Sequence, residues 1–247
     1  MISMIKKTDA QGELVYGINP IVELLKAKRR KLISVYTTKP TPKSWDKIER
    51  LLPERIQIQY VSRDVLTKIA GTSDHQGVLA WAQPFIYRKK PFDPARQKHL
   101  ILLDGIQDAR NLGAILRSAY CTHFDGIVLP QKGTVPLNAA ALKASAGLAE
   151  HLEIYWATSA HAAVQELHAA GYQFYMAAFK GENATTIAYK QPLCLVIGSE
   201  GFGISPALLK MGTQITLPQI SADVSYNASV AAGILLFLIA NQLHMIE

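Results

Sequence analysis

Residues 195–205, LVIGSEGFGIS, run from an apolar stretch into three glycines that surround one carboxylate. The apolar start predicts a buried strand, and the glycines at 198, 201 and 203 predict a turn that permits positive φ and close approach to the backbone. A ligand could then lie against bare peptide groups beside Glu200. A Gly-rich turn that merely reverses the chain is the alternative, so a binding role requires partners from other segments.

The length and composition predict a globular chain with one large or two modest domains. The 247 residues include 49% hydrophobic residues, enough for sizeable cores. A formal net charge of +7 favours a polyanionic partner, with a solvated basic face as the alternative. The basic residues gather in two places: Lys26, Lys28, Arg29, Arg30 and Lys31, and then Arg88, Lys89 and Lys90.

Several classes of protein are disfavoured. Cys121 and Cys194 show no CxxC spacing, so neither a disulfide framework nor a zinc site is indicated, and a reducing cytoplasm fits. No secretory signal is visible at the N-terminus. The longest apolar run, residues 230–240, spans about 16 Å as a helix and falls short of a membrane core of roughly 30 Å. We therefore expect a soluble cytoplasmic protein without a metal site.

The pattern of elements predicts two domains. A small α/β module occupies residues 1–83, with strands at 32–37, 56–61 and 77–81 and a helix capped by Asn19 that opens on Pro20. A proline-containing linker is expected at 84–98 and a second α/β domain at 99–247. Its strands are expected at 99–103, 126–130, 173–177, 193–197 and 214–217. Their alternation with helices predicts a parallel sheet whose ligand site lies at the carboxyl ends of the strands.

A second polar segment, DGIQDARNLGAILRSA at residues 104–119, follows the first of these strands. Asn111 is expected to cap the helix that follows, and Arg117 falls about two turns later. Gly113 and Ala114 lie beside Arg117 on the helix, which leaves room for a substrate backbone. The alternative is an ordinary surface arginine.

A third segment, ITLPQISADVSYNASVAA at residues 215–232, again follows a strand. Ser225, Tyr226, Asn227 and Ser229 place hydrogen-bonding groups at the start of a helix, although simple capping by Ser225 or Asn227 would also explain them. Three such segments, each after a strand, make a shared site more plausible than any one alone.

In this order the three segments resemble the signature motifs of the SpoU (TrmH) family of RNA ribose 2′-O-methyltransferases, within the SPOUT superfamily. KASAGLAEH at 143–151 resembles the helix between those motifs. YGINPIVELL at 16–25 and HQGVLA at 75–80 resemble the family's N-terminal substrate-binding domain. The arrangement is most similar to the branch that methylates a guanosine of 23S ribosomal RNA.

The resemblance implies a catalytic domain threaded as a deep trefoil knot, preceded by a small domain resembling ribosomal protein L30e. It also implies S-adenosylmethionine as methyl donor, RNA as substrate and a homodimer that packs near the knot. The implied catalytic positions are Asn111, Arg117, Glu200, Ser225 and Asn227. The implied donor-binding positions are Ile197, Gly198, Gly201, Leu217 and Tyr226. The chain departs from the family pattern at Ala109, where proline is common, and at Tyr226, where leucine is common.

Arginine keeps its proton in proteins, so Arg117 is expected to anchor a phosphate and stabilise a developing alkoxide rather than act as a base. Glu200 is expected to position Asn111 or the ribose, or else to brace its loop. Three other functions stay open at this point: a tRNA ribose methyltransferase, a non-catalytic RNA-binding protein on the same scaffold, and an enzyme acting on a small nucleotide.

Overall fold

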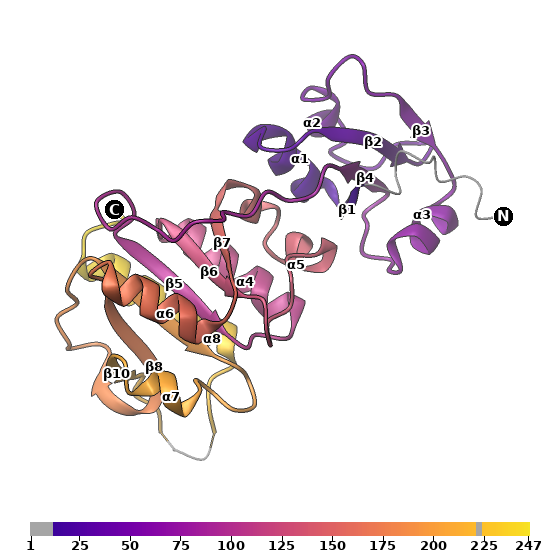
Figure 1. Cartoon of the computed structure of the whole chain (residues 1–247). Coiled ribbons are helices and arrows are strands. Elements are labelled where there is room, and N and C mark those ends of the chain that lie inside the picture. Colours follow the sequence, from indigo (N-terminus) through magenta and orange to yellow (C-terminus); the bar gives the residue numbers. More distant parts are fainter. Residues whose placement is uncertain (1–11, 221–223) are drawn as a thin grey trace. The chain divides into compact units, whose positions relative to one another are not determined.

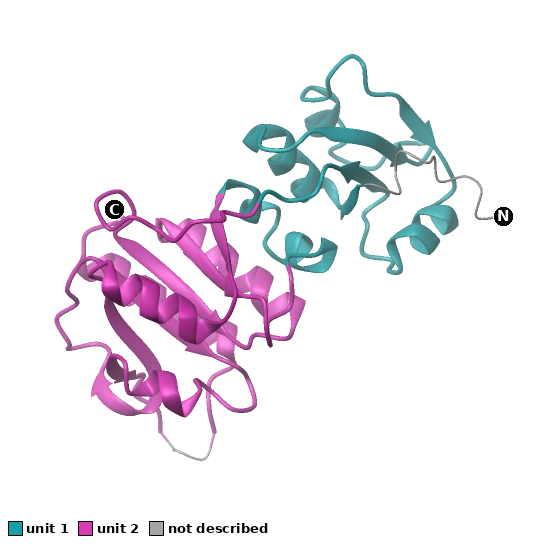
Figure 2. Cartoon of the chain, in the orientation of Figure 1, with its two compact units in different colours: residues 1–86, 137–151 teal, residues 87–136, 152–247 magenta. Residues whose placement is uncertain are grey.

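The chain forms two compact units in a computed structural model that describes residues 12–220 and 224–247 (Figure 2). The first unit combines the chain up to Ile86 with residues 137–151, and the second combines residues 87–136 with 152–247. Segment 137–151, which the sequence pattern assigned to the catalytic domain, therefore belongs to the first unit. The chain passes from one unit to the other three times.

The first unit is built on a four-stranded mixed sheet in the order β1-β4-β2-β3. The strand β4 is antiparallel to β1 and β2, and β2 is parallel to β3. The three predicted strands are confirmed, and β1 is an additional one that the short segment before Gly17 did not reveal. The bounds are β1 (Glu13–Tyr16), α1 (Ile18–Ala27), β2 (Leu32–Thr37), α2 (Asp46–Glu49), β3 (Ile58–Tyr60), α3 (Arg63–Ala70) and β4 (Val78–Ala82).

Helix α1 begins two residues earlier than predicted. Its N-cap is Gly17, at φ 94°, and not Asn19, so Asn19 and Pro20 lie inside the first turn. The backbone N–H of Ile18 donates to Oε1 of Gln76 at 3.1 Å. The side chain of Gln76, which precedes β4 and is distant in sequence, therefore caps α1 in place of Asn19.

The segment 137–151 forms two short helices rather than one. Helix α5 (Ala139–Ala144) is separated from the 3-10 helix η2 (Leu148–His151) by Ala146 and Gly147, which both have positive φ. A Cβ on Gly147 would lie 2.6 Å from the Cα of Pro20, so glycine permits the close approach to α1.

A buried ion pair joins this segment to the rest of the first unit. Arg30 contacts Glu150 through both Nε and Nη2, at 3.1 and 2.5 Å, and both side chains are 1% exposed. Arg30 also donates to Glu13 at 2.8 Å. Arg30 is therefore unavailable to the polyanion that the basic run suggested, because its charge is already neutralised inside the unit.

Breaking this pair should unfold the first unit more readily. We expect Glu150→Ala to lower its free energy of unfolding by about 3 kcal/mol, because a buried guanidinium loses its main partner. Asp46→Ala, which removes an exposed pair with Arg50, should cost less than about 1 kcal/mol. Urea unfolding followed by tryptophan fluorescence measures both, since Trp45 and Trp81 lie in this unit. Equal losses in the two variants would contradict the assignment.

The second unit is built on a six-stranded sheet in the order β10-β8-β9-β5-β6-β7, and each pairing is parallel. The predicted parallel α/β sheet is confirmed. Strand β7 was missed, and β8 is longer than predicted. The bounds are β5 (His99–Asp104), β6 (Gly126–Pro130), β7 (Glu153–Ala157), β8 (Gln173–Asn183), β9 (Leu193–Gly198) and β10 (Thr213–Thr216).

Helices cover both faces of this sheet (Figure 1). On one face, α6 (Ala160–Ala169) and α7 (Pro206–Leu209) share a buried cluster with β5 and β9. On the other, α4 (Ala109–Cys121) packs against α8 (Ala228–Gln242), which also contacts β9. Among the helices of the described ranges, none is long and apolar enough to cross a membrane.

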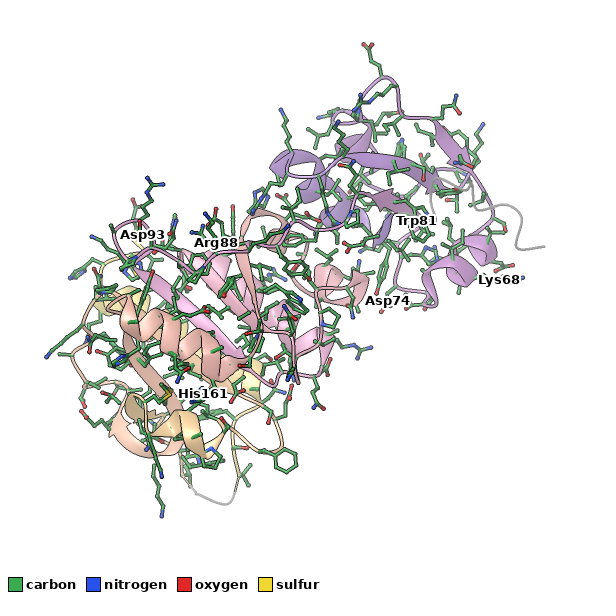
Figure 3. All side chains as sticks on the ribbon, in the orientation of Figure 1. Lys68, Asp74, Trp81, Arg88, Asp93 and His161 are labelled. Atoms are coloured by element: carbon green, nitrogen blue, oxygen red, sulfur yellow. The ribbon has the colours of Figure 1, made fainter. Side chains whose placement is uncertain are left out.

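The segment predicted as a linker is mostly part of the second unit. The backbone N–H of Arg88 donates to the carbonyl of Ile154 at 2.7 Å, beside β7. The Arg88 side chain, labelled in Figure 3, pairs with Glu153 at 2.7 Å and lies 4.7 Å from the ring centre of Phe92. Phe92 is buried in the core of the unit. Arg88 therefore has a structural role that the basic cluster at 88–90 did not indicate.

Candidate active site

The loops after β5 and β9 lie at the same edge of the sheet. The register pairs Asp104 with Gly198, so the two strands end side by side. Oδ2 of Asp104 also accepts a hydrogen bond from the backbone N–H of Ser205 at 3.1 Å. The first two polar segments therefore meet, as predicted.

Helix α4 begins earlier than expected, which changes the role of Asn111. Asp108 is the N-cap and accepts a hydrogen bond from the N–H of Arg110 at 2.7 Å. Ala109 takes the first helical position, where proline is favoured, so this departure from the family pattern is conformationally mild. Asn111 is thus not the cap, and its side chain is free to reach another loop.

Asn111 reaches Glu200. Its Nδ2 donates to Oε1 of Glu200 at 2.7 Å, across 89 residues of sequence. The expected contact between these two residues is present. No described residue donates to Oδ1 of Asn111, so this oxygen is available to accept a hydrogen bond from a ligand.

The loop that carries Glu200 is tightly closed. Ser199 and Gly203 exchange two backbone hydrogen bonds, at 3.1 and 3.0 Å, and the N–H of Phe202 donates to Oγ of Ser199 at 3.2 Å. This geometry holds the Glu200 backbone in place at the sheet edge.

The three glycines of this loop have separate roles, and only part of the expectation for them holds. Only Gly203 has positive φ, at 66°. A Cβ on Gly198 would overlap the backbone of Gly203 and Ile204, so Gly198 permits the loop to fold back on its own strand. The space on that side of Gly198 is occupied by protein rather than left for a ligand. Gly201 faces open space.

Three of the residues implied for donor binding lie at the ends of β9 and β10, two strands that are not neighbours in the sheet. Ile197 and Gly198 end β9, whereas Leu217 follows the end of β10. Between them, β8 pairs with β9 only as far as Met176 and Val196. In the described ranges the backbone of Ile197 and Gly198 therefore has no partner strand on the β8 side. Unpaired main-chain groups suit a ligand bound largely through the backbone.

The third segment is only partly brought into this site. Asn227 caps α8, where its Oδ1 accepts hydrogen bonds from N and Oγ of Ser229 at 2.9 and 2.6 Å, so the capping role is confirmed. The Tyr226 hydroxyl lies 3.5 Å from the carbonyl oxygen of Pro218. Ser225 is exposed. Within residues 12–220 and 224–247, no hydrogen bond joins Ser225 or Asn227 to the other predicted catalytic side chains.

Arg117 is exposed on α4 and has no ion-pair or hydrogen-bond partner among the described residues. Packing explains part of the small-residue face beside it, because Gly113 is buried. On the neighbouring helix, a Cβ on Gly233 of α8 would lie 3.5 Å from Oγ of Ser118. Helices α4 and α8 therefore approach closely. The guanidinium itself remains available for an anionic ligand.

The first unit has a basic cavity that the sequence pattern did not reveal. It has a volume of about 350 Å³ and lies at the start of α1. Its polar lining is Asn19, Lys43, Ser44, Lys47 and Gln76. Lys43 and Lys47 lie four residues apart around the start of α2. In the sequence this pair is a weaker signal of a basic site than the run of basic residues at 26–31. No group of three or more His, Cys, Asp or Glu in the described ranges is placed to hold a metal ion.

Comparison with known families identifies the chain. The model of the SpoU rRNA Methylase family matches residues 98–237, more than half of the chain. The chain belongs to the SpoU methylase family. The SpoU match contains every residue predicted for the site. A second family model, RNA 2′-O ribose methyltransferase substrate binding, matches residues 14–88.

Relatives of this SpoU chain include two similar along most of their length. YacO of Bacillus subtilis, named as a TrmH family tRNA/rRNA methyltransferase, is 33% identical over 237 residues, which cover 92% of this chain and 94% of YacO. A Mycolicibacterium gilvum protein, described as an uncharacterized tRNA/rRNA methyltransferase, is 33% identical over 248 residues, which cover 96% and 78% of the two chains.

Solved structures share the fold. An RNA 2′-O ribose methyltransferase matches with a TM-score of 0.83 at 21% identity, covering 96% of this chain and 91% of that one. The SpoU methyltransferase AviRb from Streptomyces viridochromogenes, solved with the cofactor AdoMet, matches with a TM-score of 0.80 at 21% identity, covering 98% and 94%. The two-unit α/β architecture is therefore that of known SpoU enzymes.

The glycine roles lead to a prediction. We expect Gly198→Ala to lower the free energy of unfolding of the second unit by about 1–3 kcal/mol, because the methyl group must displace backbone. Gly201→Ala, where a Cβ meets nothing within 4 Å, should change it by less than about 0.5 kcal/mol. Thermal unfolding measured by circular dichroism compares the two. A tolerated Gly198→Ala would show that the loop is not closed in this way.

Proposed function

We propose that the chain transfers a methyl group from S-adenosylmethionine to the ribose 2′-hydroxyl of a guanosine in 23S ribosomal RNA. The observation that carries the proposal is the hydrogen bond from Asn111 to Glu200 at the carboxyl ends of the strands. Asn111 lies on the same helix as Arg117, which has no partner among the described residues. Membership of the SpoU family supports methyl transfer to RNA. The names of relatives include both tRNA and rRNA, and the choice of 23S guanosine rests on the motif resemblance.

S-adenosylmethionine supplies, when bound, a methyl group activated by a sulfonium. The backbone of Ile197 and Gly198 on the β8 side would hold it, with Gly201, Leu217 and Tyr226 as further contacts. The exposed ring of Tyr226 would form part of the pocket wall in place of the family's leucine.

The substrate groups are assigned to three side chains. Oδ1 of Asn111 accepts a hydrogen bond from the ribose 2′-hydroxyl, and Glu200 fixes the amide so that this oxygen points outward. Arg117 binds the neighbouring phosphate and stabilises the negative charge that develops on the 2′-oxygen. Because arginine keeps its proton, the hydroxyl proton passes to water. Asn227 and Ser225 support the loop before α8.

RNA selection is assigned to the first unit. The cavity at the start of α1 combines two lysines with the partial positive charge of a helix N-terminus, a combination that suits a phosphate of the RNA backbone. Arg30 and Arg88 are excluded from this role by their ion pairs. The RNA-binding surface therefore does not include these two members of the basic runs.

A homodimer is proposed from the exposed face of α8. Val230 and Phe237, spaced by about two turns, are 49% and 54% exposed, with the half-buried Ile234 between them. An apolar stripe of this kind suits a second copy of the chain.

Two finer features of the fold are proposed on the family resemblance. One is the deep trefoil knot: the chain leaves β10 at the outer edge of the sheet, yet α8 returns to pack against α4 and β9, a path that is compatible with threading. The other is the likeness of the first unit to ribosomal protein L30e, which its mixed sheet with flanking helices allows.

Nucleoside mass spectrometry of RNA from cells with and without the protein tests the function. Loss of one 2′-O-methylguanosine from large-subunit RNA supports the proposal. Loss of a ribose methyl from tRNA would move the substrate to the alternative. No change in either RNA, together with no binding of S-adenosylmethionine by calorimetry, would favour a non-catalytic RNA-binding protein.

Arg117 provides a direct test of the chemistry. We expect Arg117→Ala to lower kcat by a factor of about 10²–10³, because charge stabilisation at the 2′-oxygen is lost. Arg117→Lys should keep part of the rate, because the ammonium retains the positive charge but not the planar guanidinium fork. Methyl transfer from labelled donor between pH 6 and 9 measures both. An undiminished rate in Arg117→Ala would remove Arg117 from the chemistry.

The dimer is tested separately. Phe237→Glu should convert the protein to a monomer in analytical ultracentrifugation, because a carboxylate cannot be buried in an apolar interface without a partner. Phe179→Glu, at a 62% exposed site on β8, serves as control and should leave the sedimentation unchanged. A wild-type monomer at micromolar concentration would contradict the proposed dimer.

A further inference from the structure

Phe202 stands at the tip of the Glu200 loop with its side chain fully in solvent. It is 97% exposed, more than any other aromatic residue in the described ranges. A phenylalanine in this position gains nothing from burial in the unit. Its ring is therefore available to a partner from outside the unit.

Hydrogen bonds within the loop hold the backbone of Phe202 in a fixed position. The backbone bonds between Ser199 and Gly203 close the loop beneath it, and its own N–H is tied to Oγ of Ser199. Ile204, directly after the loop, is buried in the core cluster. The position of the Phe202 Cα is therefore fixed by the folded unit, and only the side chain can rotate.

The surroundings of the ring leave both of its faces accessible. Its neighbours in sequence are Gly201 and Gly203, and apart from the adjoining residues no described atom lies within 4 Å of the position that a Cβ would take on either glycine. This isolation differs from the stripe on α8, where several apolar side chains gather on one helix as a protein partner would require. A lone flat ring offers little area to a protein surface, but it offers a complete π-face to another flat ring.

The site beside Phe202 indicates which flat ring this is. Glu200, two residues earlier, holds Asn111, and α4 presents the exposed cations Arg110 and Arg117 on either side of Asn111 along the helix. Cations suited to phosphates and an aromatic suited to bases are the two components of single-strand recognition. Unstacking the target nucleotide would also remove its base from its stacking neighbours, and an aromatic side chain can replace them.

We propose that Phe202 stacks on an unpaired base of the RNA at or next to the methylated nucleotide, and so helps to place the 2′-hydroxyl at Asn111. The inference rests on the proposed function, since it takes RNA to be the substrate. Phe202 is a positioning residue: it touches the base and takes no part in methyl transfer itself.

The kinetic test uses RNA purified from cells that lack the protein and labelled S-adenosylmethionine. Phe202→Ala should raise the KM for RNA roughly 5- to 150-fold, the range expected for loss of one stacked base. Phe202→Trp should retain the wild-type KM, whereas Phe202→Leu should behave like alanine because it lacks a π-face. The affinity for S-adenosylmethionine, measured by calorimetry, should be the same in all variants. Phe179→Ala is the matched control and should leave the KM unchanged.

A binding test separates this inference from the proposed function. In Phe202→Trp the added tryptophan should be quenched when the same RNA is titrated in, and a Phe179→Trp control should not. If the wild-type protein methylates no RNA, the proposed function fails, while the quenching still decides whether a base stacks here. A wild-type KM in Phe202→Ala or Phe202→Leu, an unquenched tryptophan, or a monomer produced by Phe202→Ala would each overturn the inference.

Discussion

The parallel pairing of β5 with β9 is the constraint on which the site depends. These two strands are central in the six-stranded sheet, and their register ends with Asp104 beside Gly198. Because parallel strands point the same way, the loop that leads into α4 and the loop that carries Glu200 must emerge together. The 2.7 Å hydrogen bond from Asn111 to Glu200 is a consequence of this pairing. A shift of register would separate the two side chains.

The Gly198 backbone converts this pairing into a defined loop. Its missing side chain lets residues 203 and 204 return against the end of β9, and the bonds between Ser199 and Gly203 then close the turn. The polar Glu200 and the apolar Phe202 both project from this one closed loop. Close packing beneath the loop therefore accounts for two different side chains being held at the sheet edge.

Several elements follow from local sequence, and several do not. The strands β2, β6 and β9 coincide closely with apolar runs, because burial on both faces of a sheet gives a continuous apolar signal. Strands β1 and β7 were missed: β1 is only four residues long, and β7 carries Glu153, which pairs with Arg88. Two helix starts were predicted too late. The N–H of Ile18 in α1 is capped by Gln76 from outside the segment, whereas Asp108, itself a preferred N-cap residue, was passed over for Asn111.

By itself the sequence determined the α/β class, the parallel sheet of the larger unit and the family membership suggested by three motifs, and it offered Asn111 as one possible partner of Glu200. These depend on periodicity and motif order, which a linear chain carries. Only the tertiary structure decided that residues 137–151 join the first unit, that Arg30 is buried against Glu150, and that Gly198 faces backbone. Each of these depends on contacts between residues far apart in the chain, which local pattern does not encode.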